Sequence, residues 1–417
     1  MGAQDTTQLI TTSKSNLAKS RLSLWPGLVF GILLALQGCN GLVTDSSQFR
    51  PIPGSKDGGA SALAINVNTS FQGHIAFVRN QQLYTLSGKD GSVNALVVGS
   101  HAQDPAYAPD GSHLAYVRRG ANWSDLMVVP SQGGQAIALT HNQGTGKQIV
   151  CANGLSEADT AWAANPIWTQ DGAALYFLSD AQKLLKTSCG FQDMAVWKIP
   201  ARGGNAQIVL WPARGDNDTG LPGAGGDANL SLRPGSGVQL TYTHYAYDPK
   251  ATDNLLVQVF LAALDQQPEP AQGQQSNPTQ GQQQETALAP ALGIDSKPQQ
   301  TREASWSPDG QNLAYIIGTD GSASLAIMRV SDPANGSPDF GDYAKSTRPD
   351  LGSGAISYPV WSPDGKSLLY LQYKNNQYNL WLAQLAFNGA TISIQGKPIQ
   401  LTDGGVDGDS RPSWTSA

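Results

Sequence analysis

The sequence predicts an all-β fold built from repeated units of short antiparallel strands, and three observations support this prediction. The 417 residues include 46 Gly and 25 Pro, and only 14% are charged, which favours short strands and tight turns over helical bundles. A turn motif recurs along the chain at long, similar intervals. No apolar stretch with helical periodicity longer than a few turns follows residue 40. We therefore expect little helix.

The repeated motif combines an aromatic residue with an Asp-Gly pair three to four residues later. Its aromatic position recurs at 107, 168, 232, 306, 361 and 414, and periods of this size indicate blades or solenoid units. The copy around Trp168 lacks the proline of the turn, and the copy around Leu232 is degenerate. The last copy is cut off by the chain end. The motif residues are Tyr107, Asp110, Gly111, Trp168, Asp171, Gly172, Trp306, Asp309, Gly310, Trp361, Asp364, Gly365 and Trp414.

The chemistry of the motif explains its spacing. In Pro-Asp-Gly the proline presets φ, the aspartate caps the turn and the glycine accepts a positive φ. The residues before the turn form a first, inner strand, and Leu-x-Tyr or Leu-x-Phe after it alternates as a second strand. A third strand follows, and a fourth ends in Leu-Thr at 139–140 and 401–402. Four antiparallel strands per repeat make a propeller blade.

The two ends of the repeated region predict the blade count. The motif at Trp414 opens a blade that the chain does not finish, whereas residues 73–78 begin at a second-strand position. We therefore expect a six-bladed β-propeller over residues 73–417, closed by N-terminal strands pairing with the C-terminal strand, which removes exposed sheet edges. The repeated aromatic residues would pack between neighbouring sheets. The alternative is that the tryptophans stack on sugars.

The first residues have the pattern of a targeting segment. Lys14, Lys19 and Arg21 precede an almost uncharged apolar run that ends in Leu-Gln-Gly before Cys39. This predicts a lipoprotein signal peptide over residues 1–38, with lipidation of Cys39 as a membrane anchor. An ordinary signal peptide and an uncleaved anchor are the alternatives. Residues 39–72 are polar and without periodicity, so we expect a flexible tether.

Two further features concern the mature domain. Residues 266–284 are rich in Gln, Pro and Gly and are expected to form a disordered loop. Cys151 and Cys189 are the two cysteines left after Cys39, and an oxidising compartment favours a disulfide between them over two unpaired thiols.

The Trp-Ser-Pro-Asp-Gly repeat resembles the WD40-like (PD40, WSPDG) repeats of the TolB-like six-bladed β-propeller family. It is also similar to the propeller domains of prolyl-oligopeptidase and dipeptidyl-peptidase relatives. The resemblance covers roughly residues 73–417 and implies the fold more than the function. TolB carries an α/β domain before its propeller, and the short segment after Cys39 leaves no room for one. A role in a Tol–Pal system is therefore not expected.

The residues with catalytic potential do not form a recognised pattern. No Gly-x-Ser-x-Gly nucleophile motif occurs, and the five histidines lack metal-ligand spacing. Asp403, Asp407 and Asp409 lie in a Gly-rich loop that could hold Ca²⁺ or be a solvated connection. The inner strands supply few polar side chains to a channel, and the residues at equivalent places are Asp104, Asn165, Asn229, Glu303, Tyr358 and Arg411.

We therefore expect a non-catalytic, membrane-anchored binding or scaffold propeller outside the cytoplasm, on the periplasmic side or the cell surface, without metal or cofactor. Its partner would be a protein, peptide or glycan. The net charge of −6 and the absence of Lys/Arg runs make nucleic acid a poor partner. The alternatives are a propeller hydrolase or lyase with a channel-bound metal, and a detached peptidase-type propeller domain.

Overall fold

The computed structural model describes residues 48–53, 62–99, 101–150, 154, 156–185, 194–210, 226–235, 239–247, 255–264, 286–287, 300–318, 323–330, 346–352, 354–389 and 391–417. All of them belong to one compact unit that spans Asp45–Ala417. The predicted signal peptide (1–38), the predicted lipidation site Cys39, the cysteines Cys151 and Cys189, and the loop 266–284 lie outside the described residues.

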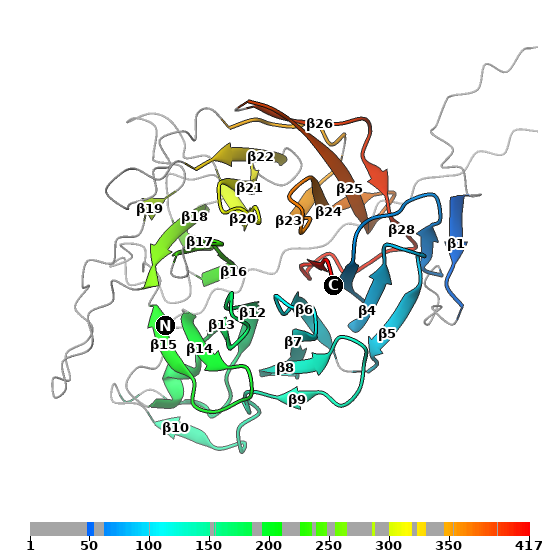
Figure 1. Cartoon of the computed structure of the whole chain (residues 1–417). Helices are drawn as coiled ribbons and strands as arrows, with labels where there is room; N and C mark the ends of the chain where they lie inside the picture. The colour runs from blue at the N-terminus through cyan, green and yellow to red at the C-terminus, as the bar shows by residue number, and fades with distance from the viewer. Residues whose placement is uncertain are drawn as a thin grey trace, which may run out of the picture. The chain divides into compact units, whose positions relative to one another are not determined.

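Six antiparallel sheets each start from a strand that contains one copy of the repeat. They follow one another around a common centre, from blue through green to red in Figure 1, with the first strands innermost. Sheet 1 contains β29 (Ser413–Thr415), β3 (His74–Arg79), β4 (Gln82–Ser87) and β5 (Val93–Val97); sheet 2 contains β6 (Ala102–Tyr107), β7 (His113–Arg119), β8 (Ser124–Pro130) and β9 (Ile137–Ala138); sheet 3 contains β12 (Ala163–Trp168), β13 (Ala174–Ser179), β14 (Ala195–Pro200) and β15 (Gln207–Leu210).

The remaining three repeat-bearing sheets keep the same order of strands. Sheet 4 contains β16 (Gly226–Leu232), β17 (Gln239–Tyr247), β18 (Leu255–Ala263) and β19 (Thr286–Ala287); sheet 5 contains β20 (Thr301–Trp306), β21 (Asn312–Ile317) and β22 (Ser324–Arg329); sheet 6 contains β23 (Ile356–Trp361), β24 (Ser367–Lys374), β25 (Gln377–Asn388), β26 (Thr391–Ile394) and β27 (Ile399–Gln400). This architecture confirms the predicted all-β propeller fold.

The predicted count of six blades was wrong, because the described residues form a seventh sheet of three strands. It consists of β1 (Phe49–Pro51), β2 (Ala64–Asn66) and β28 (Thr402–Asp403). This N-terminal sheet carries no copy of the repeat. Its strands are two or three residues long, too short to show alternation in the sequence. β2 pairs with β1 on one side and, on the other, with residues of β28 more than 330 positions away.

Part of the predicted tether over residues 39–72, namely the described residues 48–53 and 62–72, belongs to the folded unit. Leu63 and Ile65 are fully buried and pack in the apolar cluster that also contains side chains of sheets 1 and 6. A segment that pairs and buries apolar side chains is part of the folded unit.

Two short pieces complete the described structure, the hairpin of β10 (Gln148–Val150) and β11 (Ser156–Ala158) and a 3-10 helix at Ala181–Leu185.

The core consists of apolar layers between neighbouring sheets. Five of six buried clusters combine side chains of two adjacent sheets, and the sixth combines sheets 1 and 6 with the N-terminal sheet. The second strand contributes one large aromatic residue to most of them. Tyr116, Phe177, Tyr242, Tyr315 and Tyr370 are at most 2% exposed. Complete burial of such a side chain contributes about 1.5–3 kcal/mol. Sheet-on-sheet packing therefore supplies most of the stability.

Two repeated tryptophans also join consecutive first strands by hydrogen bonds. The indole N–H of Trp168 donates to the carbonyl oxygen of Ala106 at 2.9 Å, and that of Trp361 donates to the carbonyl oxygen of Ser305 at 3.0 Å. Each bond links a sheet to the one before it. The described geometry gives these residues a packing role at the sheet interfaces.

The degenerate copy of the repeat is followed by a buried arginine. Sheet 4 has Leu232 at the aromatic position, and the next residue, Arg233, places its guanidinium 4.8 Å from the ring centre of Trp306 in sheet 5. Arg233 also donates to the carbonyl oxygen of Gly310 at 2.8 Å. This arginine thus adds to the contact that Trp306 makes between sheets 4 and 5.

The Asp-Gly turns have the conformation that the motif predicts. Gly111, Gly172, Gly310 and Gly365 have φ between 67° and 69°, which L-amino acids with a side chain adopt at a cost. In every copy an aspartate oxygen accepts a backbone N–H two residues on; the acceptors are Asp110, Asp171, Asp309 and Asp364. These turns join first to second strands, so they all lie on one face of the propeller, the turn face.

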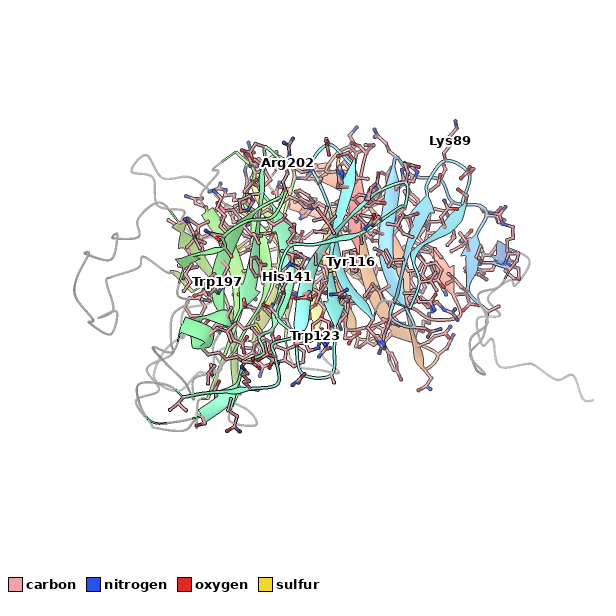
Figure 2. The ribbon with its side chains drawn as sticks, turned by 90° about the horizontal axis from the view of Figure 1, so that it is seen from below. Lys89, Tyr116, Trp123, His141, Trp197 and Arg202 are labelled. Carbon is pink, nitrogen blue, oxygen red and sulfur yellow. The ribbon has the colours of Figure 1, made fainter. Side chains whose placement is uncertain are left out.

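The opposite face carries the turns between second and third strands and the links between sheets. Figure 2 shows this separation: Lys89 and Arg202, in turns between third and fourth strands, lie toward one side, and Trp123 in the β7–β8 turn lies toward the other. We call the side with Trp123 the link face. Antiparallel connectivity alone fixes this division.

We expect the aspartate turns to make stability depend on pH in the acid range. The backbone N–H of Ser92 lowers the pKa of Asp90 to about 2, the backbone N–H of Ser112 lowers that of Asp110, and the Thr169 hydroxyl lowers that of Asp171. In the unfolded chain these carboxyls titrate near 3.9. The unfolded state therefore binds more protons below about pH 4, and stability present above pH 4 is lost as the pH falls toward 2. Titration by carboxyl NMR tests this, and a midpoint near 4 for Asp90 would contradict it.

Removing the last strand should weaken the fold. Trp414 in β29 donates to the carbonyl oxygen of Gln72 at 2.8 Å and packs edge-on against Phe71 with ring centres 5.5 Å apart. We expect Trp414→Ala to lower the free energy of unfolding by about 2–3 kcal/mol, because the ring is only partly buried. Deletion of residues 411–417 should cost more, since it also exposes the edge of β3.

Thermal unfolding of both variants beside the parent chain measures these effects. Deletion of residues 266–284 serves as the control, because loop length enters stability only logarithmically. A truncated chain that melts like the parent would contradict the expectation.

Candidate functional site

The first strands bring six polar positions to the axis of the propeller. Five of them lie at a register shift in the pairing of first and second strands and have a positive φ, between 46° and 59°: Asp104, Asn165, Asn229, Glu303 and Tyr358. A bulge of this kind re-aims a side chain. We call these residues, with Arg411 at the sixth place, the axial ring.

Hydrogen bonds connect members of the axial ring from sheet to sheet. The Asp104 carboxylate accepts from the Asn165 side chain at 2.8 Å and from the Arg411 backbone N–H at 3.2 Å. The Asn229 N–H donates to the Asn165 side chain at 2.9 Å, and the Tyr358 N–H donates to the Glu303 carboxylate at 2.6 Å. The ring side chains therefore serve as cross-links between inner strands.

The side chain of Arg411 extends to carbonyl groups of other sheets. Its guanidinium donates to the carbonyl oxygens of Leu230 at 2.6 Å and Pro166 at 3.2 Å, in sheets 4 and 3. Burial raises the pKa of Asp104, although the nearby positive charge of Arg411 opposes that shift. Burial and the carboxylate of Glu303 raise the pKa of Tyr358 well above its usual value. The sequence analysis named these six residues at the inner-strand positions that would face a channel. In the structure most of their polar groups form hydrogen bonds with other parts of the chain.

The acidic loop uses its carboxylates separately. Asp403 accepts from the Gln377 side chain at 2.9 Å, Asp407 accepts from two backbone N–H groups of the β3–β4 turn, and Asp409 accepts from the Gln103 side chain at 2.8 Å. Within the described part of the chain no group of three or more His, Cys, Asp or Glu residues could hold a metal ion. The described residues also contain no helix long and apolar enough to cross a membrane.

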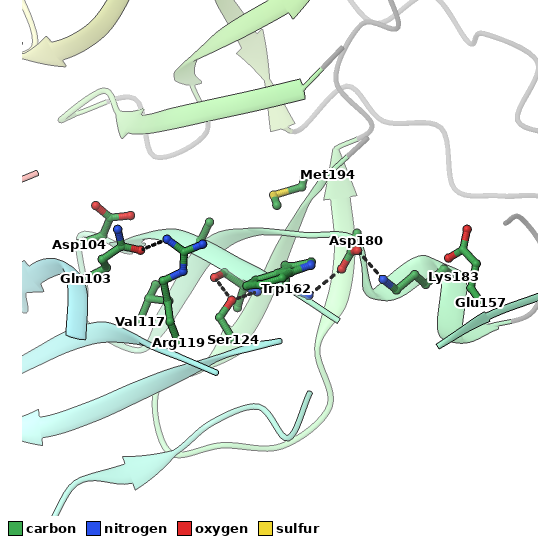
Figure 3. A pocket seen from close by; sticks show the side chains of 12 residues that line it. Gln103, Asp104, Val117, Arg119, Ser124, Glu157, Trp162, Asp180, Lys183 and Met194 are labelled. Atoms are coloured by element: carbon green, nitrogen blue, oxygen red, sulfur yellow. Dashed lines mark hydrogen bonds and ion pairs between the residues drawn. The ribbon is translucent and has the colours of Figure 1, made fainter. Parts of the chain in front are cut away.

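A pocket of about 410 Å³ opens beside the axial ring, between sheets 2 and 3 on the link face. Figure 3 shows its side chains, with Asp104 at the axial end and Glu157 at the outer end. The lining residues are Gln103, Asp104, Val117, Arg119, Ser124, Glu157, Trp162, Ala163, Ala164, Asp180, Lys183 and Met194.

Trp162 lies at the middle of this pocket, in the link that enters sheet 3. Its backbone N–H donates to the buried Asp180 carboxylate at 2.7 Å, and the other oxygen of Asp180 pairs with the Lys183 ammonium at 2.7 Å. On the other side the Arg119 guanidinium stacks over the Trp162 ring, 5.5 Å from its centre. In Figure 3 the tryptophan accordingly lies between the arginine and the Asp180–Lys183 pair.

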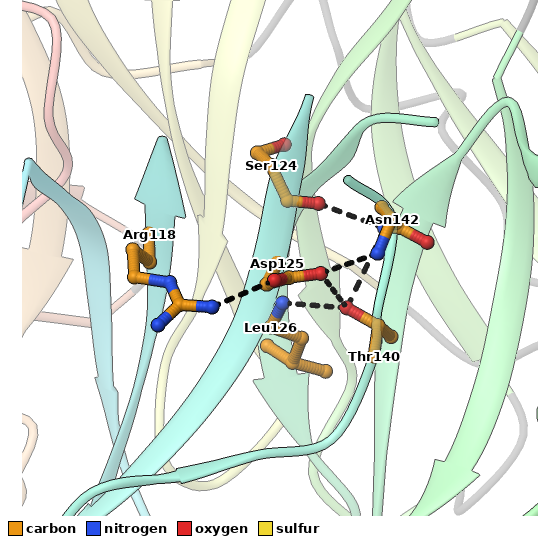
Figure 4. Close-up of polar contacts among 6 residues, drawn as sticks. All are labelled: Arg118, Ser124, Asp125, Leu126, Thr140 and Asn142. Atoms are coloured by element: carbon orange, nitrogen blue, oxygen red, sulfur yellow. Dashed lines mark hydrogen bonds and ion pairs between the residues drawn. The ribbon is translucent and has the colours of Figure 1, made fainter. Parts of the chain in front are cut away.

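The wall of the pocket is rigid because Ser124 joins the two sheets. Its hydroxyl donates to the Ala163 carbonyl at 2.6 Å and accepts the Ala163 N–H at 2.8 Å. The next residue, Asp125, is 2% exposed and accepts from the Arg118 side chain and the Asn142 backbone. Figure 4 shows this network, which Thr140 completes by accepting the Leu126 N–H at 2.9 Å.

The Leu-Thr ends noticed in the sequence form equivalent networks in two sheets. At the edge of sheet 6, Thr402 of β28 accepts the N–H of Leu380 at 2.9 Å and contacts the Asn379 side chain at 3.2 Å, as Thr140 does with Leu126 and Asp125. The repeat therefore extends to the fourth strand. Apart from Asp104, the pocket residues were missed by sequence reasoning, because they lie in links and at strand ends outside the repeated motif.

Comparison with known proteins identifies no family for this chain, and its similarities to solved structures are distant. No protein-family model matches the chain, and no curated protein matches it. Among solved structures, TolB from Acinetobacter baumannii is 15% identical with a TM-score of 0.49, covering 84% of this chain and 67% of that one. A nidogen/laminin complex is 10% identical, with a TM-score of 0.42 and coverages of 75% and 89%. An oligogalacturonate lyase in complex with manganese is 14% identical, with a TM-score of 0.39 and coverages of 78% and 82%.

These similarities are too distant to transfer an activity or a partner. The strand order and the axial ring define the chain as a β-propeller protein whose axis is cross-linked by its own side chains. Its described pocket lies off the axis, between two blades.

Proposed function

We propose that this chain is a non-catalytic binding propeller, held at a membrane outside the cytoplasm, whose pocket between sheets 2 and 3 receives a peptide segment of a protein partner. The observation that carries the proposal is the half-buried Trp162, held between Arg119 and the Asp180–Lys183 pair in a pocket of about 410 Å³. An aromatic surface with a few placed polar groups is the usual composition of a binding pocket.

The surroundings of the pocket support a binding role. Asp180 is buried and both of its oxygens accept hydrogen bonds, so the pocket wall is fixed before any ligand arrives. A preformed wall reduces the entropy that association costs. Tryptophan and arginine are the residue types that contribute most to protein interfaces.

The pocket also requires that sheet 1 stay next to sheet 2. We infer that the pairing of β29 with β3 closes the ring of blades. Asp104 supports this, because its N–H donates to the Ser410 hydroxyl at 2.9 Å and its carboxylate accepts the Arg411 N–H. The C-terminal segment thereby positions the axial end of the pocket.

A peptide-display selection on the purified protein tests the binding role. We expect selected peptides to lose at least about tenfold in affinity for Trp162→Ala, since truncation of a central interface tryptophan costs more than 1.4 kcal/mol. Trp123→Ala is the matched control, because Trp123 stacks under Arg118 at 5.4 Å in the same way but does not line the pocket. Peptides that bind both variants alike would place the binding surface elsewhere.

The anchor is tested separately by Cys39→Ala. We expect this variant to leave the membrane fraction or to accumulate as unprocessed precursor, because two or more acyl chains hold a protein firmly and the variant cannot be acylated. Mass spectrometry of the wild-type N-terminus is the direct measurement. A mature N-terminus elsewhere, without added acyl mass, would contradict lipidation.

A further inference from the structure

Two adjacent arginines on β7 each stack on a tryptophan, but only one of them pairs with a carboxylate among the described residues. Arg118 stacks over Trp123 at 5.4 Å, and Arg119 stacks over Trp162 at 5.5 Å. The chain supplies Arg118 with a carboxylate, since its guanidinium pairs with the buried Asp125 at 2.9 Å. Arg119 forms no salt bridge with any residue that the structure describes.

The guanidinium of Arg119 has most of its donors unused. It makes one hydrogen bond, from a terminal nitrogen to the Gln103 side-chain oxygen at 3.2 Å, whereas a guanidinium carries five N–H groups in a planar fork. Stacking on Trp162 and the bond to Gln103 hold that fork at the pocket wall (Figure 3). The Arg119 guanidinium is therefore held in place, but no described residue supplies a hydrogen-bond acceptor for its remaining N–H groups.

Three described carboxylates line the pocket, and none of them pairs with Arg119. Glu157 lies at the outer end beside Lys183, away from Arg119 (Figure 3). Asp180 is occupied by Lys183 and by the Trp162 N–H. Asp104 is occupied by the Asn165 side chain and the Arg411 N–H, and both aspartates are at most 7% exposed. The exposed cation in the middle of the pocket is left to a ligand.

We propose that the pocket recognises a carboxylate of the bound peptide, through a bidentate contact to Arg119 beside the face of Trp162. The proposal rests on the binding function proposed above and names the chemistry of its ligand. A planar guanidinium fork matches the two oxygens of a carboxylate, and charge-assisted pairs of this geometry are stronger than neutral hydrogen bonds. The carboxylate can come from a peptide C-terminus or from an Asp or Glu side chain.

The test uses synthetic octapeptide pools and the full-length protein. One pool has free C-termini without Asp or Glu, a second is C-terminally amidated and contains Asp and Glu, and a third is amidated without either residue. We expect binding to the first or second pool, which identifies the source of the carboxylate, and at least about tenfold weaker binding to the third.

Substitutions separate the fork from general charge. Arg119→Gln should reduce binding of the preferred pool about tenfold or more, and Arg119→Lys should restore it only in part because an ammonium lacks the fork. Arg202→Gln is the control and should bind like the parent, because Arg202 is an exposed arginine on the side opposite the pocket (Figure 2). Circular dichroism and thermal unfolding verify that each variant is folded.

The outcomes distinguish this proposal from the function on which it rests. If the neutral pool binds as tightly as the others and still depends on Trp162, the pocket binds peptides but the carboxylate proposal is overturned. Unchanged binding by Arg119→Gln overturns it as well. If no pool binds the parent protein, the proposed peptide-binding function fails together with it.

Discussion

Burial of both faces of every repeat-bearing sheet is the constraint on which this structure depends. Each of these six sheets contributes side chains to two apolar clusters, and each cluster is shared with a neighbouring sheet. No sheet could cover both of its faces alone, so the sheets must be arranged around a common centre. The N-terminal sheet is only partly covered: Leu63 and Ile65 pack in the layer between sheets 6 and 1, whereas β1 is largely exposed.

That arrangement brings the first strands together at the axis, where polar backbone groups need partners. The bulges satisfy this need by turning one side chain per strand into the centre, at the cost of a positive φ even at Glu303 and Tyr358. With Arg411 they form a network of cross-links rather than an open channel. The polar residues at the axis are thereby used for cohesion, and the described space for a ligand lies beside them.

The pocket results from the departures of sheets 2 and 3 from the repeat. The link into sheet 3 carries Trp162, and the segment after β13 continues into a 3-10 helix with Lys183 instead of a tight turn. Ser124 and the Asp125 network fix the wall against which these insertions pack. The regular repeat provides a rigid frame, and the irregular segments provide the chemical groups, as is common where loops carry function on a fixed scaffold.

The sequence by itself determined the elements that depend on local chemistry. Period-2 alternation and the Asp-Gly turns located the repeat-bearing strands, and Trp168 and Trp361 were placed correctly between sheets. The N-terminal sheet could not be found in this way, because its strands are two or three residues long and one of them, β28, lies far along the chain from the other two. The pocket had no sequence signal either: Arg118 and Arg119 are neighbours of the same type, and only the tertiary contacts give one of them a carboxylate and leave the other without one. Packing between distant segments decides which groups are satisfied internally, and local sequence patterns do not record it.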